Sequence, residues 1–247
     1  MKLYHYIILV FIIIPNQSFA KLENINTKYT LNLNVIGVHI KIGEINSYLL
    51  TKDNEYNLNF NLSSENLVDI ITSISGNGTV SGIIDKKFLY PRNYQYNFTK
   101  KNKTKKTKIL FNNLTVTTSE TIPNFDKKKL SPINDEMLIK TIDPITAIIY
   151  IGNYNLTNKC SIDYRVFDGK RRYNLNYTDI FIKNGYLICR LVQNKIGGFK
   201  VDDKNRDLFR PAQQIDTYYK KEDEKYILKK IVTESKFSKI SIDVSYF

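Results

Sequence analysis

The sequence is poor in the residues that build the commonest reactive centres. Its 247 residues include two cysteines, two histidines and no tryptophan. Two thiols cannot make a disulfide-dense scaffold or a four-thiolate zinc site, and two imidazoles cannot make a three-histidine metal centre. Glycine, with 10 residues, and proline, with 6, are also scarce, which excludes collagen-like and low-complexity chains. We therefore expect a folded protein with no metal site and no cofactor.

The first twenty residues have the pattern of a secretory signal peptide. Lys2 precedes an apolar run over residues 7–14, which is followed by Pro15 and by the small residues Ser18 and Ala20. This run is about half of the roughly 20 apolar residues that a helix needs to cross a bilayer. We expect cleavage after Ala20 and a mature protein that is periplasmic or secreted.

Apolar content and length predict one domain in the mature chain. Hydrophobic residues make up 42% of the sequence, and a chain of this size normally buries a single large core. Neither an internal repeat nor an interdomain linker is evident. We expect residues 21–247 to form a single antiparallel β domain.

Positive charge dominates the mature chain. Of 37 basic residues, cleavage removes only Lys2, and 24 acidic residues remain, so the side-chain net charge is +12. Because the protein is expected to be exported, we expect no nucleic-acid partner. The charge favours anionic envelope material such as phospholipid head groups or acidic polysaccharide. The alternative is a general compositional bias that only keeps the protein soluble.

Short alternating runs of apolar and polar residues dominate from Tyr29 onward. Tyr29, Leu31, Leu33 and Val35 share one parity, and comparable runs recur along most of the chain. Alternation with period two is typical of antiparallel strands with one buried face. The fold class is therefore mainly β (α+β), with one large bent antiparallel sheet or half-barrel that partly encloses two short helices.

Two segments carry the signals of those helices. In the first, Leu67, Ile70, Ile71 and Ile74 lie at helical spacing before Gly76.

The second helix begins at Asp143-Pro144, where the aspartate is a helix N-cap and the proline occupies the first turn. Because most of its positions are apolar, we expect the sheet to enclose it. Ile145, Ile148 and Ile149 are then candidates for contact with an apolar ligand.

Two dipeptides predict hairpins, because both central positions of a type I′ turn need positive φ. Asp168-Gly169 predicts a two-residue turn that pairs Val166 with Arg171, and Asn184-Gly185 predicts the next hairpin.

Arg171 and Arg172, beside the first turn, are candidates to bind a phosphate or carboxylate, since a guanidinium offers a bidentate fork. The alternative for Arg172 is an ion pair with Asp163 across the hairpin.

These motifs occur in order along the chain: Asp143-Pro144-Ile145-Thr146-Ala147, Cys160, the run from Val166 to Leu175, Cys189 and Gly197-Gly198-Phe199. Together they resemble the exported bacterial family catalogued as domain of unknown function 3108. The most specific part is the Phe-Asp-Gly-Lys-Arg-Arg-Tyr run at residues 167–173. The resemblance implies a layout similar to that of the periplasmic lipoprotein carriers, whose bent sheet half-encloses helices and an apolar groove. It implies no established activity.

Six lysines crowd one turn between Phe98 and Ile109: Lys100, Lys101, Lys103, Lys105, Lys106 and Lys108. They suit an anionic membrane surface, to which the protein would bind peripherally at most. The alternative is a solvated loop tip.

Cys160 and Cys189 are the only thiols of a chain that is expected to meet an oxidising compartment, so we predict a disulfide between them. In a flat meander they would lie on opposite faces of strands about 10 Å apart, whereas a disulfide needs Cα atoms within about 7 Å. We therefore expect residues 158–161 to leave the sheet, or a bulge near Thr178 to shift the parity.

Few residues suit catalysis. His39 is the only imidazole left after cleavage, and its place on the polar parity of a strand favours a surface or hydrogen-bonded structural role. Asp163 and Asp168 could act as a hydrolytic carboxylate pair. Turn and pairing roles account for them as well, so we expect no catalytic residues, and a hydrolase is the weaker alternative.

The sequence as a whole therefore favours a non-enzymatic envelope protein. We expect it to bind an apolar or amphipathic ligand, a lipid or an acylated protein, in the concavity of the bent sheet. An envelope scaffold or interaction protein without a cavity ligand is the alternative. The sequence does not predict an oligomeric state.

Overall fold

The structure is a computed structural model. It describes residues 24–35, 38–65, 73–85, 88–153, 160, 163–201, 214–223, 225–234 and 238–247. The predicted signal peptide lies outside these ranges. Most of the first predicted helix also lies outside them, and Ile74 at its end begins a strand instead.

Fourteen strands form one sheet, and the first seven are β1 (Ile25–Val35), β2 (Val38–Lys52), β3 (Glu55–Ser64), β4 (Ile74–Asp85), β5 (Phe88–Lys100), β6 (Lys103–Asn112) and β7 (Thr115–Ile122). The other seven are β8 (Thr141–Ile142), β9 (Asp163–Phe167), β10 (Arg172–Lys183), β11 (Tyr186–Gly197), β12 (Gln214–Glu222), β13 (Lys225–Glu234) and β14 (Ser238–Tyr246). Helix α2 (Pro144–Asn153) is the one α-helix among the described residues, and two short 3₁₀ helices, Lys127–Lys129 and Asp135–Leu138, lie between β7 and β8. The mainly β class is confirmed.

The sheet consists of two meanders joined along β1 and β14. Each strand pairs with the next along the chain except that β7 and β8 are the two edges, and β1 pairs with β14. All pairs are antiparallel apart from β8 with β9. The two edges approach each other, because the backbone N–H of Thr141 donates to the carbonyl of Leu114 at 2.6 Å.

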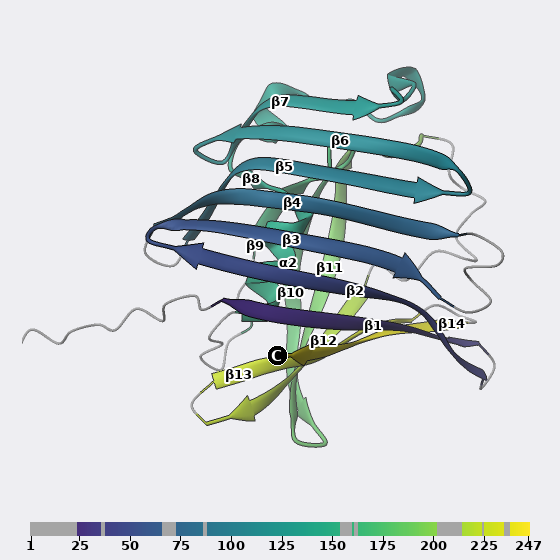
Figure 1. Cartoon of the computed structure of the whole chain (residues 1–247), viewed down its shortest axis with the longest axis vertical. Helices are drawn as coiled ribbons and strands as arrows, with labels where there is room; N and C mark the ends of the chain where they lie inside the picture. Colours follow the sequence, from purple (N-terminus) through teal and green to yellow (C-terminus); the bar gives the residue numbers. More distant parts are fainter. Residues whose placement is uncertain are drawn as a thin grey trace, which may run out of the picture.

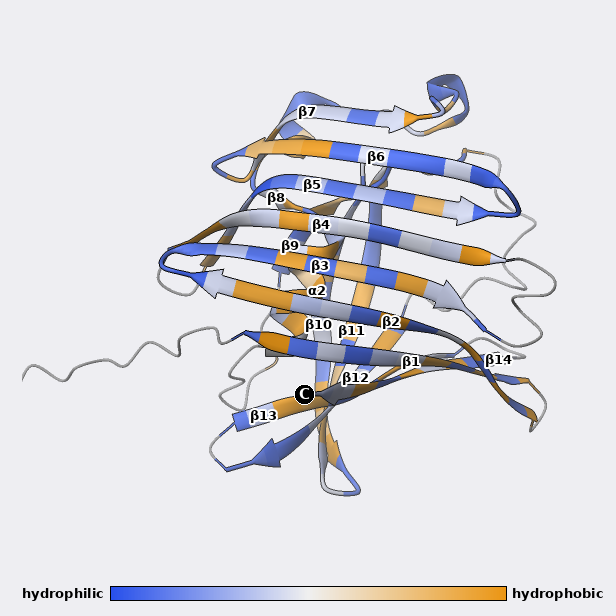
Figure 2. Ribbon diagram, in the orientation of Figure 1, coloured by the Kyte–Doolittle hydropathy of each residue, from blue (hydrophilic) through white to orange (hydrophobic). Residues whose placement is uncertain are grey.

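This pairing bends the sheet around the helix. In Figure 1, β2 to β6 cross the front of the molecule, β10 and β11 run steeply behind them, and α2 lies between the two parts. The result is a nearly closed, barrel-like layer. Figure 2 shows how hydrophobic and hydrophilic residues alternate along its strands. In β3, for example, Tyr56, Leu58 and Phe60 are buried and the residues between them are exposed.

The predicted cap of the second helix is present. One carboxylate oxygen of Asp143 accepts hydrogen bonds from the backbone N–H groups of Ile145 and Thr146, both at 2.9 Å. The other accepts from the Thr146 hydroxyl at 2.6 Å. Burial raises the pKa of Asp143, and these hydrogen bonds oppose that rise.

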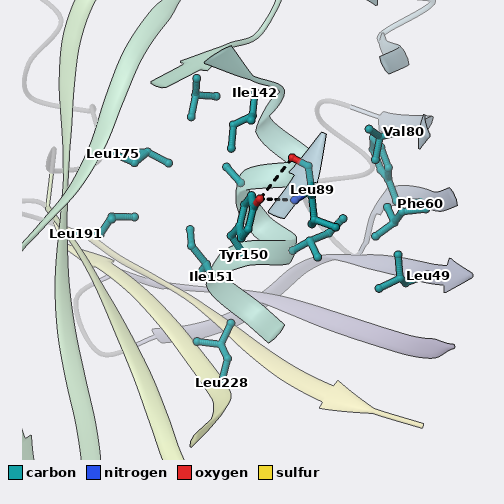
Figure 3. Close-up of a cluster of buried hydrophobic side chains, with 14 of the residues drawn as sticks. Leu49, Phe60, Val80, Leu89, Ile142, Tyr150, Ile151, Leu175, Leu191 and Leu228 are labelled. Carbon is teal, nitrogen blue, oxygen red and sulfur yellow. Dashed lines mark hydrogen bonds between the residues drawn. The ribbon is translucent and has the colours of Figure 1, made fainter. Parts of the chain in front are cut away.

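Buried tyrosines connect the helix to the sheet around it. Figure 3 shows the Tyr150 hydroxyl bonded to the backbone N–H and carbonyl of Leu89 on β5. One residue further along the helix, the Tyr219 hydroxyl donates to the carbonyl of Ile151 at 2.9 Å. The last carbonyls of a helix lack intrahelical partners, so a hydroxyl from the sheet satisfies one of them. The expected enclosure of this helix is therefore present.

The first predicted hairpin forms with a longer loop than expected. Strand pairing begins at Phe167 and Arg172, so the loop between them has four residues instead of two. Asp168 is the reason, because its Oδ1 accepts hydrogen bonds from the backbone N–H groups of Lys170 and Arg171 at 2.9 and 2.6 Å. The register differs from the prediction by two residues, which leaves the same side chains on each face.

The second hairpin has the predicted two-residue turn. Lys183 pairs with Tyr186, and Asn184 and Gly185 have φ of 51° and 76°. Both signs are those of a type I′ turn.

The predicted disulfide is also present. The Cα atoms of Cys160 and Cys189 are 5.8 Å apart. Cys160 lies before β9 begins at Asp163, and the register of β10 against β11 shifts between Tyr177 and Asp179. The predicted shift of parity near Thr178 is therefore present, whereas residues 158, 159 and 161 of the other predicted segment lie outside the described residues.

Candidate functional site

A cavity of about 580 Å³ lies between the concave face of β1 to β6 and helix α2. Its volume is within the range of about 300–1,000 Å³ that is usual for ligand sites. Most of its lining is apolar, with Leu49, Leu58 and Phe98 from the sheet and Ile231 and Ile242 from β13 and β14. The cavity can therefore bury the apolar surface of a ligand away from water.

Strand β4 contributes no residue to the lining of this cavity. Of its inward positions, Gly76, Gly78 and Gly82 have no side chain, whereas Val80 is buried in the core and Ile84 packs against it. A Cβ atom at Gly78 would lie 2.5 Å from Cζ of Phe60, so the Phe60 ring lies over this glycine. The glycines thus leave room for aromatic rings from the neighbouring strands.

An aromatic row covers that part of the wall. The ring centroids of Phe60 and Tyr96 are 5.5 Å apart, and those of Tyr96 and Phe98 are 6.1 Å apart. Tyr29 lines the opposite part of the cavity, and burial raises its pKa to about 12. The polar hydroxyls of the wall therefore stay neutral at ordinary pH.

Helix α2 supplies the other side of the cavity. Ile145, Ile148 and Ile149, which the sequence singled out, all line it together with Pro144. Ile149 is buried, whereas Ile148 is the exposed member of the set.

The structure separates the two predicted arginines. Arg171 lines the cavity, and its Nε donates to Oδ2 of Asp168 at 2.8 Å. Arg172 is 1% exposed and is not part of the lining. Its guanidinium donates instead to the carbonyl of Met137 at 2.7 Å and to Oδ1 of Asn174 at 2.8 Å.

Arg172 therefore has a structural position, where it links the 3₁₀ turn before β8 to β10. Desolvation by burial lowers its pKa to about 10. The predicted alternative partner, Asp163, accepts a hydrogen bond from Asn176 at 2.9 Å instead. The sequence pattern missed this position because the covering turn comes from a segment 35 residues away.

The six predicted lysines also divide between two faces. Only Lys105 lines the cavity, on the same side of β6 as the buried residues Thr107 and Ile109. Lys106 and Lys108 are exposed on the other face of the strand, and the remaining three (Lys100, Lys101 and Lys103) are exposed around the β5–β6 turn. The period-two pattern of β6 could have identified Lys105 as the inward member.

The tip of the β9–β10 hairpin packs against β6. Gly169 has φ of +87°, and a Cβ atom there would lie 2.4 Å from Cγ2 of Thr107. This close approach brings Asp168 and Arg171 to the same end of the cavity as Lys105. Burial lowers the pKa of Lys105, and the charge of Asp168 partly opposes this effect.

The other candidates from the sequence lie elsewhere. Nε2 of His39 is 3.2 Å from Nδ2 of Asn34, in an exposed position on β2. Within the part of the chain that the structure describes, no three His, Cys, Asp or Glu residues are grouped to hold a metal. None of the described helical segments has the length and hydrophobicity that a bilayer crossing requires.

Comparison with solved structures finds a match at low sequence identity. The chain is similar to the crystal structure of a beta-barrel-like protein of domain of unknown function DUF1849 from Brucella abortus. The identity is 8%, the TM-score is 0.45, and the match covers 92% of this chain and 98% of that chain. Comparison with curated proteins gives no match. The profile of the family described as "Protein of unknown function (DUF3108)" matches residues 28–245. Because this match spans nearly the whole chain, the protein belongs to the DUF3108 family.

Proposed function

We propose that this protein is an exported, non-enzymatic protein of the cell envelope that binds an apolar or amphipathic ligand, a lipid or an acylated protein, in the cavity beside α2. The observation that carries the proposal is the cavity of about 580 Å³, with an apolar wall on the sheet side and three isoleucines on the helix side. Burial of apolar ligand surface is worth about 25 cal/mol per Å².

Two further observations support the proposed location and setting. The Cys160–Cys189 disulfide is of the kind that forms in oxidising, extracytoplasmic compartments. Lys106 and Lys108 are exposed on the outer face of β6, which supports contact with an anionic envelope surface.

Native mass spectrometry of the purified protein is the direct test. A copurified lipid or acyl chain is expected, as extra mass that is lost on collisional activation. Binding of the neutral dye Nile red, measured by its fluorescence, reports on the same site even while the natural ligand is unidentified.

A pair of variants on β2 locates the binding. Ser47 lines the cavity, and its neighbour Asn46 is exposed on the opposite face of the strand. Ser47→Trp fills the cavity and is expected to reduce Nile red binding by about tenfold or more, which corresponds to about 1.4 kcal/mol. Asn46→Trp adds the same ring outside and should bind normally.

Thermal melts of both variants establish that each is folded. Equal dye binding by the two variants, together with the absence of any copurified lipid, would favour the alternative function, an envelope scaffold without a cavity ligand.

A further inference from the structure

We propose that Lys105 and Arg171 bind the anionic head group of an amphipathic ligand, a carboxylate or a phosphate, at the β6 end of the cavity. The inference rests on the proposed function and adds the chemistry of the ligand head.

The position of Lys105 connects the apolar wall to a positive charge. In the register of β5 with β6, Phe98 pairs with Lys105 and Tyr96 pairs with Thr107. The aromatic row therefore runs along the cavity wall and ends at an ammonium group. A ligand tail against these rings places its head beside Lys105.

Among the residues that the structure describes, Asp168 is the one carboxylate in the cavity lining, and its oxygens are already engaged. Asp168 accepts from the backbone N–H groups of Lys170 and Arg171 through Oδ1, and from Nε of Arg171 through Oδ2. Among the described residues, Nζ of Lys105 has neither a hydrogen-bond nor an ion-pair partner. Arg171 uses only Nε, which leaves its two terminal nitrogens for another acceptor.

The balance of charge at this end is positive. In the described part of the chain, Lys105 interacts electrostatically with Asp168, Lys170 and Arg171, so these four groups carry a net charge of +2. The ammonium of Lys170 is turned toward the Phe125 ring, 5.8 Å from its centroid. Lys105 and Arg171 thus remain to accept an anion, and both can donate charge-assisted hydrogen bonds.

Without a ligand, partial burial of the Lys105 ammonium carries a desolvation free-energy cost. Lys105 is half-buried between Phe98 and the hairpin tip, and desolvation lowers its pKa. A desolvated charge is stabilised when it is paired with an opposite charge that also accepts its hydrogen bonds. An anionic head supplies both.

The test compares ligands that share one tail and differ in their heads. Laurate, lauryl phosphate and lauryl alcohol each compete with Nile red for the full-length purified protein. The same titrations are made with Lys105→Gln and with its control Lys106→Gln, which removes a neighbouring lysine from the outer face of the same strand.

We expect laurate, lauryl phosphate or both to bind at least tenfold more tightly than lauryl alcohol, as a charge-assisted pair predicts. Lys105→Gln should abolish this preference while leaving alcohol binding intact, and Lys106→Gln should retain it. Whichever anion is preferred identifies the head as carboxylate or phosphate.

Two other results would overturn the inference in distinguishable ways. Equal affinity for the alcohol and both anions refutes the head-group site and leaves the apolar cavity as proposed. Absence of binding by all three compounds refutes both proposals. The comparison of heads in the unmodified protein needs no variant, so it decides the question even if Lys105→Gln fails to fold.

Discussion

Individual side chains supply the long-range links in this protein. Tyr219 is 1% exposed, and its hydroxyl contacts both the carbonyl of Ile151 and the hydroxyl of Tyr177. Cys160 is joined to Cys189, 29 residues further along the chain. Such contacts hold the helix and Cys160, which precedes β9, against strands that are remote in sequence.

Removal of the disulfide tests its contribution to the free energy of unfolding. The double variant Cys160→Ser/Cys189→Ser should lose roughly 3 to 4 kcal/mol of unfolding free energy, by the chain-entropy model for a loop of about 30 residues. Urea denaturation measures the loss. Intact mass after alkylation, with and without reduction, checks that the unmodified protein holds the bond. Labelling of both thiols without reduction would contradict it.

At the scale of elements, the β9–β10 hairpin organises the polar end of the cavity. Its loop combines a side-chain cap from Asp168 with a glycine that approaches β6 closely. The β10–β11 hairpin provides a natural comparison, because Gly185 also has positive φ, 76°, but a Cβ atom there would meet nothing within 4 Å.

Substitution of each glycine by alanine separates strain from packing. Gly185→Ala should cost about 1–2 kcal/mol for an L-residue at positive φ. Gly169→Ala should cost about 1–3 kcal/mol more, because its Cβ overlaps the buried Thr107. Thermal and urea unfolding of the two variants measure the difference. Equal losses would show that the hairpin tip does not pack on β6 as described.

At the scale of the whole molecule, the tyrosines couple the fold to pH. Burial raises the pKa of nine of them: Tyr29, Tyr56, Tyr94, Tyr96, Tyr173, Tyr177, Tyr218, Tyr219 and Tyr246. In the unfolded chain a tyrosine loses its proton near pH 10. Above that pH the folded state holds more protons than the unfolded state, so the free energy of unfolding falls as pH rises.

We therefore expect the free energy of unfolding to change little through tyrosine ionisation below about pH 9.5 and to fall steeply toward pH 12. Each buried tyrosine adds a slope of up to about 1.4 kcal/mol per pH unit in this window. Urea melts at a series of pH values measure the slope. Tyr219→Phe should reduce it by about one such increment. A stability that is constant up to pH 11.5 would contradict the burial of these hydroxyls.

The local elements were predictable because their signals act over a few neighbouring residues. Alternation in β3, the cap at Asp143 and the turn at Asn184-Gly185 depend on bonds and side chains close in sequence. The shift of parity between Cys160 and Cys189 was also predictable, because strand geometry alone would place the two thiols on opposite faces of the sheet.

The tertiary structure decided what depends on segments remote in sequence. The pairing of β1 with β14 curves the sheet around α2, and no local pattern specifies it. The burial of Arg172 under the turn at Met137, and the grouping of Lys105 with Arg171, follow from that curvature and from the contact of Gly169 with Thr107. Sequence periodicity determines which face a side chain takes, whereas only the packed sheet determines what that face meets, because packing joins residues that the chain itself keeps far apart.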